Sequence, residues 1–284
     1  MSEQSATLDR LVAHAGLRLK AAGVADPKRE AWRIWADLKG LSSHTGSILS
    51  EEAVPGGEAE RFRNAVDRRA GGEPLPYVTG LVGFRELTLH ADRRALIPRP
   101  ETEGLVELVL ARAPGGRVAD IGTGTGCIAL ALADEGRYDQ ILAVDRSREA
   151  LALAAENRTV TRLRIDLVLG DLLGSLGTET LDAVVSNPPY LSEAEFAALD
   201  SSVKAWEPKL ALASGDDGLL ATRQLLHDAV RVVRPGGWVA LEIDASRGAE
   251  SARVAEVAGW SDIVVHDDLF GRARYLVARR SEIL

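Results

Sequence analysis

From Arg117 onward, the chain alternates short runs of apolar, often β-branched residues with stretches that read as helices. Seven runs have the length and composition of strands: residues 118–121, 141–145, 165–168, 183–186, 238–243, 263–266 and 275–278. Strands that alternate with helices pair in parallel, because each helix returns the chain to the same end of the sheet. The loop between the last two runs is too short for a crossover helix, so we expect those strands to pair antiparallel. The pattern predicts an α/β fold with a doubly wound, mostly parallel sheet.

The first part of the chain reads as a small helical bundle. Apolar residues recur at helical spacing in two stretches. They are Leu8, Leu11, Val12, Ala15 and Leu19 in the first stretch and Trp32, Trp35 and Leu38 in the second. Asp26 and Pro27 mark the start of the second helix and Gly40 marks its end. A third helix is predicted over residues 58–70, and the tryptophans are interpreted as core residues.

A linker follows the bundle. Residues 73–77 contain two prolines and are predicted not to form a helix. Residues 86–90 alternate like a strand. We therefore divide the chain into a helical domain over residues 1–72, a linker with a short β-hairpin over residues 73–98, and an α/β domain over residues 99–284.

A glycine-rich segment closes the first predicted strand of the sheet and opens a helix. Glycines allow the backbone to turn sharply and to approach a ligand closely. The spacing is G-x-G-x-G, and Cys127 stands where the dinucleotide pattern G-x-G-x-x-G has its third glycine, so NAD is disfavoured. Cofactor contacts are predicted for six residues of this glycine loop: Asp120, Gly122, Thr123, Gly124, Thr125 and Gly126.

The next two predicted strands lead to acidic residues at the same edge of the sheet. Asp145, nineteen residues after Gly126, can accept hydrogen bonds from two ribose hydroxyls. Asp171 can accept from the amino group of adenine, and the amide of Leu172 can donate to the ring. The alternatives are that Asp145 caps the next helix and that Asp171 is an ordinary turn residue. With the glycine loop, these residues predict a pocket for adenosine and resemble the S-adenosyl-L-methionine (SAM) site of Rossmann-like methyltransferases.

The fourth predicted strand ends in Asn187-Pro188-Pro189-Tyr190. Because proline has no amide hydrogen, this segment offers acceptors, the side-chain oxygen of Asn187 and the carbonyl of Pro188, and few donors. A planar NH₂ group that donates both hydrogens to them is held rigidly, with its lone pair free to face a methyl donor. The segment predicts methylation of an amide or aminopurine nitrogen without a metal. The alternative is a proline-rich turn after a buried strand.

These residues receive the following roles. The catalytic residues are Asn187, Pro188 and Tyr190, and the substrate-binding residues are Asn187, Pro188, Pro189 and Tyr190. The resemblance to methyltransferases implies that Asn187 also lines the cofactor. Tyr190 is expected to pack against the flat face of the substrate.

With these motifs the chain resembles the release factor glutamine methyltransferases (PrmC/HemK), a family of class I SAM-dependent methyltransferases. Segments 74–80 and 96–103 share the resemblance, which spans nearly the whole chain. It implies a Rossmann-like, seven-stranded SAM-dependent methyltransferase domain behind a small helical domain. It also implies transfer of a methyl group from SAM to the side-chain amide nitrogen (N5) of the glutamine in the GGQ motif of class-one peptide chain release factors, with S-adenosyl-L-homocysteine as product.

The resemblance implies that residues 1–72 recognise the substrate. Two positions depart from the family pattern, which usually has glutamine in place of Pro76 and often an aromatic residue in place of Leu172. The leucine can still offer its backbone amide but cannot stack. For segment 97–103 two interpretations remain open. Its acidic residues could favour the start of a helix, or Arg99 or Thr102 could contact the cofactor.

Charge separates this prediction from its main rival, an adenine-amino methyltransferase of DNA or RNA. The chain has 34 Lys and Arg against 42 Asp and Glu, a net charge of −8, and residues 1–80 hold 11 of each sign. The negative excess therefore lies wholly in the α/β part, which weighs against a polyphosphate substrate. The arginines of the third helix are interpreted as one solvated face: Arg61, Arg63, Arg68 and Arg69. Two further alternatives are a glutamine methyltransferase of a large-subunit ribosomal protein and a SAM-binding scaffold without catalysis.

The remaining expectations concern surroundings and partners. The longest apolar run, residues 127–133, is far shorter than the roughly 20 residues of a transmembrane helix. No secretory signal is visible, and a single cysteine excludes an internal disulfide. The five histidines are far apart, so no metal site is expected. We therefore expect a cytoplasmic monomer that binds a protein substrate and neither nucleic acid nor membrane.

Overall fold

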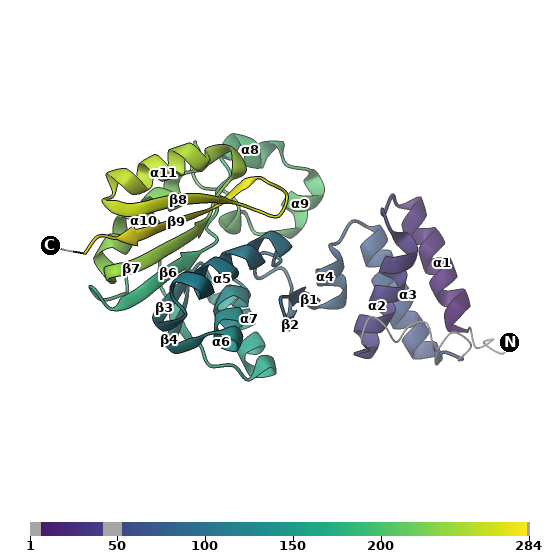
Figure 1. Ribbon diagram of the computed structural model, residues 1–284. Helices are drawn as coiled ribbons and strands as arrows, with labels where there is room; N and C mark the ends of the chain where they lie inside the picture. Colours follow the sequence, from purple (N-terminus) through teal and green to yellow (C-terminus); the bar gives the residue numbers. More distant parts are fainter. Residues whose placement is uncertain (1–6, 42–52, 283–284) are drawn as a thin grey trace. The chain divides into compact units, whose positions relative to one another are not determined.

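The computed structural model describes residues 7–41 and 53–282. The chain folds as two compact units that divide between Leu81 and Val82 (Figure 1). The first unit is helical, and the second contains a seven-stranded sheet. Each unit has its own hydrophobic core.

The helical unit is built from α1 (Leu8–Ala21), α2 (Pro27–Lys39), α3 (Gly56–Ala70) and the short α4 (Leu75–Thr79). The five apolar residues predicted to line one face of α1 are all buried. Trp35 is buried and meets Phe62 edge to face, with ring centroids 5.6 Å apart. Trp32 packs against the same cluster at its margin. The predicted bundle and the core role of Trp35 are therefore confirmed, and Trp32 is a partly buried neighbour of that core.

The helix α4 contradicts the expectation that residues 73–77 would avoid helical structure. Pro74 is the N-cap and Pro76 lies in the first turn. The first four N–H groups of a helix have no intrahelical acceptor, so a proline there removes no hydrogen bond. Gly80, with φ of 76°, ends the helix after five residues. The prolines therefore begin this helix and do not prevent it.

The interpretation of four arginines as one solvated face is wrong for Arg69, which is half-buried, whereas Arg68 is exposed and also hydrogen-bonded. Arg68 donates to both carboxylate oxygens of Glu73, at 2.6 and 2.8 Å, and to the backbone oxygens of residues 77 and 78. Arg69 binds Glu30 at 2.6 Å and so joins α3 to α2. Arg61 and Arg63 are exposed, as expected. Two arginines of this helix thus stabilise the helical unit itself.

The sheet of the second unit has the strand order β5-β4-β3-β6-β7-β9-β8. The strands are β3 (Gly115–Ile121), β4 (Arg137–Asp145), β5 (Asp166–Leu169), β6 (Leu181–Ser186), β7 (Val233–Glu242), β8 (Trp260–Asp267) and β9 (Ala273–Arg280). The first five in spatial order pair in parallel, and β9 pairs antiparallel with both β7 and β8. All seven predicted strands and the antiparallel final pair are confirmed. Five parallel strands therefore end at one edge, which positions the residues that follow them.

Helices cover both faces of this sheet. In Figure 1, α5 (Pro100–Arg112), α6 (Cys127–Glu135) and α7 (Arg148–Thr161) lie on one face, and α10 (Leu220–Val232) and α11 (Gly248–Val257) lie on the other. The central strands are buried from both sides, as in β3, where Val118 and Ala119 have no exposed surface. Between β6 and α10 the chain forms α8 (Glu193–Ala198), α9 (Ser201–Trp206) and the 3₁₀ turn η2 (Lys209–Ala211). A second 3₁₀ turn, η3 (Ala245–Arg247), follows β7.

A separate two-stranded hairpin of β1 (Leu81–Phe84) and β2 (Leu87–His90) lies within the predicted linker.

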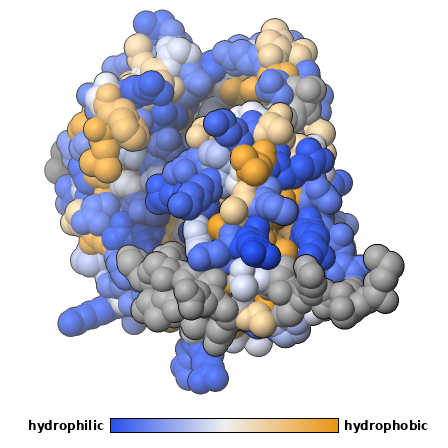
Figure 2. Space-filling view, turned by 90° about the vertical axis from the view of Figure 1, so that its right-hand side faces the viewer, coloured by the Kyte–Doolittle hydropathy of each residue, from blue (hydrophilic) through white to orange (hydrophobic). Residues whose placement is uncertain are grey.

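Hydrophilic side chains predominate on the face shown in Figure 2, and the hydrophobic ones there form small separate groups. Among the described helices, none is both long and apolar enough to cross a bilayer.

Candidate active site

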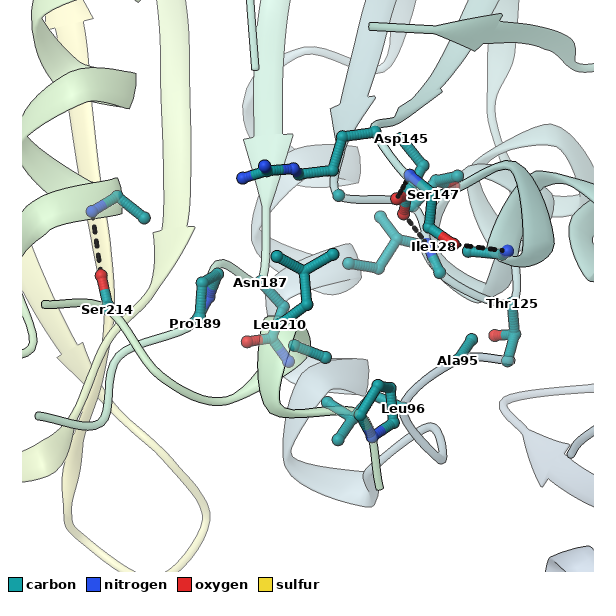
Figure 3. Close-up of a pocket in the computed structure, with 18 of the residues that line it drawn as sticks. Ala95, Leu96, Thr125, Ile128, Asp145, Ser147, Asn187, Pro189, Leu210 and Ser214 are labelled. Carbon is teal, nitrogen blue, oxygen red and sulfur yellow. Dashed lines mark hydrogen bonds between the residues drawn. The ribbon is translucent and has the colours of Figure 1, made fainter. Parts of the chain in front are cut away.

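A cavity of about 400 Å³ lies where β3, β4, β5 and β6 end. Nine of the residues predicted from sequence line it: Gly122, Thr123, Gly124, Thr125, Asp145, Asp171, Leu172, Asn187 and Pro189. In Figure 3, Asn187 lies between Asp145 and Thr125 on one side and Ser214 on the other. Four predicted residues do not line the cavity: Asp120, Gly126, Pro188 and Tyr190. The strand ends thus bring the predicted cofactor and acceptor residues into one space.

The glycine loop takes a backbone path that side chains oppose. Gly122, Gly124 and Gly126 have φ values of 72°, 56° and 83°, a region that residues with a Cβ rarely adopt. A Cβ on Gly122 would meet no protein atom within 4 Å, so the space beside it is open to a ligand. A Cβ on Gly126 would lie 3.3 Å from the side chain of Ala154, because the loop packs closely on α7 there.

Asp120 lies beneath the loop and has no exposed surface. One carboxylate oxygen accepts from the hydroxyl of Thr123 at 2.6 Å and from the amide of Ala129 at 3.2 Å. Burial raises the pKa of Asp120 to about 7, although these hydrogen bonds act in the opposite direction. The residue is placed to hold the loop in shape, and a direct cofactor contact for it stays a prediction.

Asp145 is fixed by two backbone amides. Gly124 donates to one carboxylate oxygen and Ser147 donates to the other, each at 2.9 Å. The N-cap of α7 is Ser147, whose hydroxyl accepts from Ala150 at 3.1 Å, so Asp145 is not the cap of that helix. Each carboxylate oxygen has a further lone pair that can accept from a ribose hydroxyl.

Asn157, on α7, supports the loop from behind and was not singled out from the sequence. Its side-chain nitrogen donates to the carbonyl of Thr125 at 2.9 Å and to that of His90 at 3.1 Å. Its oxygen accepts from the amide of His90 at 2.6 Å. A buried asparagine in the middle of a helix could have drawn attention to this position.

The end of β5 is less constrained. The side chain of Asp171 is 68% exposed, and its Oδ1 lies 3.8 Å from Nη1 of Arg146. Leu172 has a φ of 49°, a left-handed conformation that costs energy for a branched side chain. The amide of Gly170 donates to the carbonyl of Asp145 at 3.0 Å, which joins the ends of β5 and β4.

The segment after β6 is tied to two neighbours. The hydroxyl of Ser186 donates to the carbonyl of Ile121 at 2.6 Å, and the side-chain nitrogen of Asn187 donates to the hydroxyl of Thr102 at 3.0 Å. The hydroxyl of Tyr190 donates to Glu242 at 3.4 Å, and burial raises the pKa of both side chains. Tyr190 is thus anchored behind the cavity, and its predicted stacking on the substrate has no contact here to support it.

Sequence reasoning did not find Glu242, which is 1% exposed at the end of β7. Its other oxygen accepts from Thr102 at 2.7 Å. Like Asp145 and Asn187, Glu242 is a polar residue at the end of a strand. Unlike them, it belongs to no sequence motif. Arg99 and Thr102 line the cavity, which leaves both open interpretations of segment 97–103 standing.

A further wall of the cavity comes from the segment between α9 and α10 and from the first two turns of α10. It is formed by Pro208, Leu210, Ala211, Ala213, Ser214, Gly215, Leu220, Ala221 and Gln224. Among residues 7–41 and 53–282, no group of three His, Cys, Asp or Glu side chains is placed to hold a metal ion. Open space beside the glycine loop and a fixed carboxylate nearby fit the adenosine part of SAM.

Comparisons with known proteins identify the family. Residues 10–80 match the model of the PrmC N-terminal domain, and residues 101–205 match that of the Methyltransferase small domain. The release factor glutamine methyltransferase of Cereibacter sphaeroides is 40% identical over 92% of this chain and 94% of its own length. That of Deinococcus radiodurans is also 40% identical, over 95% and 98%. The chain belongs to the release factor glutamine methyltransferase family.

A solved structure agrees with this fold. A methyltransferase from Pyrococcus furiosus is 17% identical, covers 70% of this chain and 92% of its own, and superposes with a TM-score of 0.52. As a release factor glutamine methyltransferase family member, the protein is an enzyme with a Rossmann-like methyltransferase domain and SAM as its cofactor. The resemblance inferred from the sequence motifs is therefore confirmed.

Proposed function

We propose that the protein transfers the methyl group of SAM to the side-chain amide nitrogen of the glutamine in the GGQ motif of class-one release factors. The observation that carries the proposal is the position of Asn187, whose side chain enters the same cavity as Asp145 and the glycine loop. The curated relatives, about 40% identical over nearly the whole chain, are named for this activity.

In this proposal Asp145 and the glycine loop hold the adenosine of SAM, and SAM supplies an electrophilic methyl group. The side-chain oxygen of Asn187, which lines the cavity, accepts one hydrogen of the substrate amide, and the carbonyl of Pro188, which is not among the lining residues, is the proposed acceptor of the other. This fixes the plane of the amide and increases the electron density on its nitrogen. After transfer the nitrogen carries an excess proton, which is acidic enough to leave to solvent. No side chain has to act as a strong base.

We further propose that residues 1–72 recognise the release factor, that residues 73–98 form a linker whose last residues, 94–98, also line the cavity, and that residues 99–284 perform the transfer. A glutamine side chain alone offers too little surface to specify one protein. The net charge of −8, all of it beyond residue 80, supports a protein over a nucleic acid as substrate. A cytoplasmic monomer completes the proposal.

A transfer assay with labelled SAM tests the substrate. We expect the purified protein to label a release factor, to leave a release factor with GGQ changed to GGA unlabelled, and to leave DNA, RNA and ribosomal proteins unlabelled. Asn187→Ala should lower the rate by about 100-fold or more, while Thr159→Val, on the exposed face of α7, should not. Transfer to a nucleic acid, or equal labelling of the GGA protein, would refute the proposal.

A further inference from the structure

We propose that Thr102, held by Glu242, fixes the orientation of the Asn187 side-chain amide and is thereby a positioning residue for methyl transfer. The proposal rests on the function proposed above, because it assumes that the oxygen of Asn187 must face the substrate. Its basis is a chain of two hydrogen bonds. The amide nitrogen of Asn187 lies 3.0 Å from the hydroxyl of Thr102, which lies 2.7 Å from a carboxylate oxygen of Glu242.

The number of protons sets the direction of this chain. A threonine hydroxyl has one proton to donate, and an ionised carboxylate can only accept. The proton of Thr102 is therefore directed to Glu242, which leaves the hydroxyl oxygen as an acceptor toward Asn187. Only the NH₂ end of the Asn187 amide can then face Thr102. In the flipped amide two oxygens would lie about 3 Å apart with no proton between them, which is unfavourable in a buried place.

Two hydroxyl groups are placed as donors to the carboxyl group of Glu242, one at each oxygen. The hydroxyl of Tyr190 donates to its second oxygen at 3.4 Å, and the positive charge of Arg274 favours the ionised form. Burial and the charge of Glu101 oppose ionisation and raise the pKa of Glu242. The carboxylate thus has a hydroxyl donor at each oxygen.

The position of Thr102 is itself fixed. It lies in the first turn of α5 and is 2% exposed. The hydroxyl of Tyr275 donates to the neighbouring carbonyl of Glu101 at 2.5 Å, and β9 places Tyr275 directly opposite Glu242 in the sheet. The first turn of α5 is therefore bound to the same part of the sheet that carries Glu242. The side-chain amide of Asn187, at the end of β6, is therefore held by the first turn of α5.

The consequence concerns the oxygen of Asn187. With its nitrogen committed to Thr102, the amide directs its oxygen away from the helix and keeps it available as an acceptor. An asparagine side chain can present either its oxygen or its NH₂ group to a ligand. The buried pair of Thr102 and Glu242 thus makes Asn187 present its oxygen, an acceptor. This assigns segment 97–103 a third role, different from a helix start or a cofactor contact.

The orientation can be measured without any substrate. The chain has three asparagines, Asn64, Asn157 and Asn187, so a sample labelled with ¹⁵N-asparagine gives three side-chain NH₂ signals. We expect the Asn187 signal, assigned by its loss in Asn187→Ala, to exchange slowly with solvent. In Thr102→Val, which removes the hydroxyl but keeps the shape, its exchange should be at least about tenfold faster. Unchanged exchange in Thr102→Val would overturn the proposal.

Kinetics provide the second arm. Thr102→Val should lower kcat about 10- to 100-fold, because a poorly aligned acceptor misplaces the substrate amide, with the SAM dissociation constant close to that of the wild type. Its melting temperature should fall, because the buried carboxyl group of Glu242 loses a hydrogen-bond donor, so kcat is compared well below that temperature. Thr102→Ser, which keeps the hydroxyl, should recover most of kcat, and Thr159→Val serves as a matched control on an exposed helix. Equal kcat for Thr102→Val and wild type would refute the positioning role.

The two arms separate this proposal from the proposed function. If the wild-type protein labels no release factor, the function fails, while the exchange measurement still decides whether Thr102 holds Asn187. If wild type labels the release factor and Thr102→Val does so equally well, the function stands and the positioning role fails. If Thr102→Ser is as slow as Thr102→Val, the hydroxyl is not what matters and the proposal is overturned.

Discussion

Arg99 and Glu207, 108 positions apart in the chain, form an ion pair in which Nη2 of the arginine lies 2.5 and 2.7 Å from the two carboxylate oxygens. The glutamate side chain is 3% exposed and the arginine side chain 42%. Arg99 is the N-cap of α5, and Glu207 precedes the wall that begins at Pro208. The pair therefore joins two sides of the cavity.

Removing the arginine should cost more than removing both partners. Arg99→Met leaves a buried carboxylate without its counter-charge, and we expect the free energy of unfolding to fall by about 1–3 kcal/mol, since the arginine is partly exposed. In the double variant Arg99→Met, Glu207→Gln the buried charge is gone, so part of the loss should be recovered. Urea denaturation measures both values. A double variant less stable than Arg99→Met would contradict this account.

The two acidic residues of the cofactor side should differ in their effect on SAM binding. Asp145 is fixed by two amides, whereas Asp171 is largely exposed. Asp145→Ala should raise the SAM dissociation constant about 10- to 100-fold, since a charged hydrogen bond contributes about 1.5–3 kcal/mol. Asp171→Ala should raise it less. Calorimetry on the two variants checks this order, and the reverse ranking would argue against the assigned ribose contact.

Gly104 should resist a substitution that usually stabilises helices. Alanine in place of glycine inside a helix gains about 1 kcal/mol in general. Here a Cβ would lie 2.5 Å from the hydroxyl and 2.8 Å from the ring carbon Cζ of Tyr275, which is buried. We therefore expect Gly104→Ala to lower the melting temperature. A gain in stability would show that the ring of Tyr275 can move aside.

The pKa of Asp120 predicts a dependence of stability on pH. Burial raises this pKa from 3.8 to about 7 in the folded protein. Between these two values the folded state keeps a proton that the unfolded state has released. The contribution of Asp120 to the free energy of unfolding therefore falls as pH rises through this window, by up to about 1.4 kcal/mol per pH unit.

Asp120→Asn isolates this contribution because asparagine does not ionise. We measure the melting temperature of the variant minus that of the wild type at two pH values. This difference should be larger at about pH 8 than at about pH 5. The comparison uses protein without SAM, so that ligand binding does not enter. A difference between the two proteins that is constant with pH would mean that Asp120 keeps an ordinary pKa.

Local patterns were sufficient to predict most of the fold. The alternation of strands and helices, the glycine loop and the strand-end residues Asp145 and Asn187 depend on neighbours within a few positions. The errors were also local in origin. Pro76 was treated as a helix breaker without regard to its place in the first turn. The solvated interpretation fails for Arg69 because its partner, Glu30, lies on another helix and outside the periodic pattern of α3.

What sequence reasoning could not supply are pairings across the sheet. Thr102 and Glu242 are 140 positions apart and meet because α5 packs on β6 and β7, which are neighbours in the sheet. Neither residue lies in a motif whose spacing implies the other. The hold of Asn157 on Thr125 likewise depends on how α7 packs against the loop. Such contacts follow from strand order, which the sequence pattern left open.

The strand order has a consequence for engineering. The glycine loop, Asp145 and Asp171, predicted to hold the adenosine side, follow β3, β4 and β5, whereas lining residues 187–215 come from the continuous stretch between β6 and α10. That stretch leaves the sheet at Ser186, and the chain returns to it in the adjacent strand β7. It is therefore one contiguous block that begins after β6 and ends at the start of α10, the helix that leads into β7. A recombination library that exchanges residues 188–219 alone would vary the acceptor nitrogen while the adenosine side is inherited unchanged.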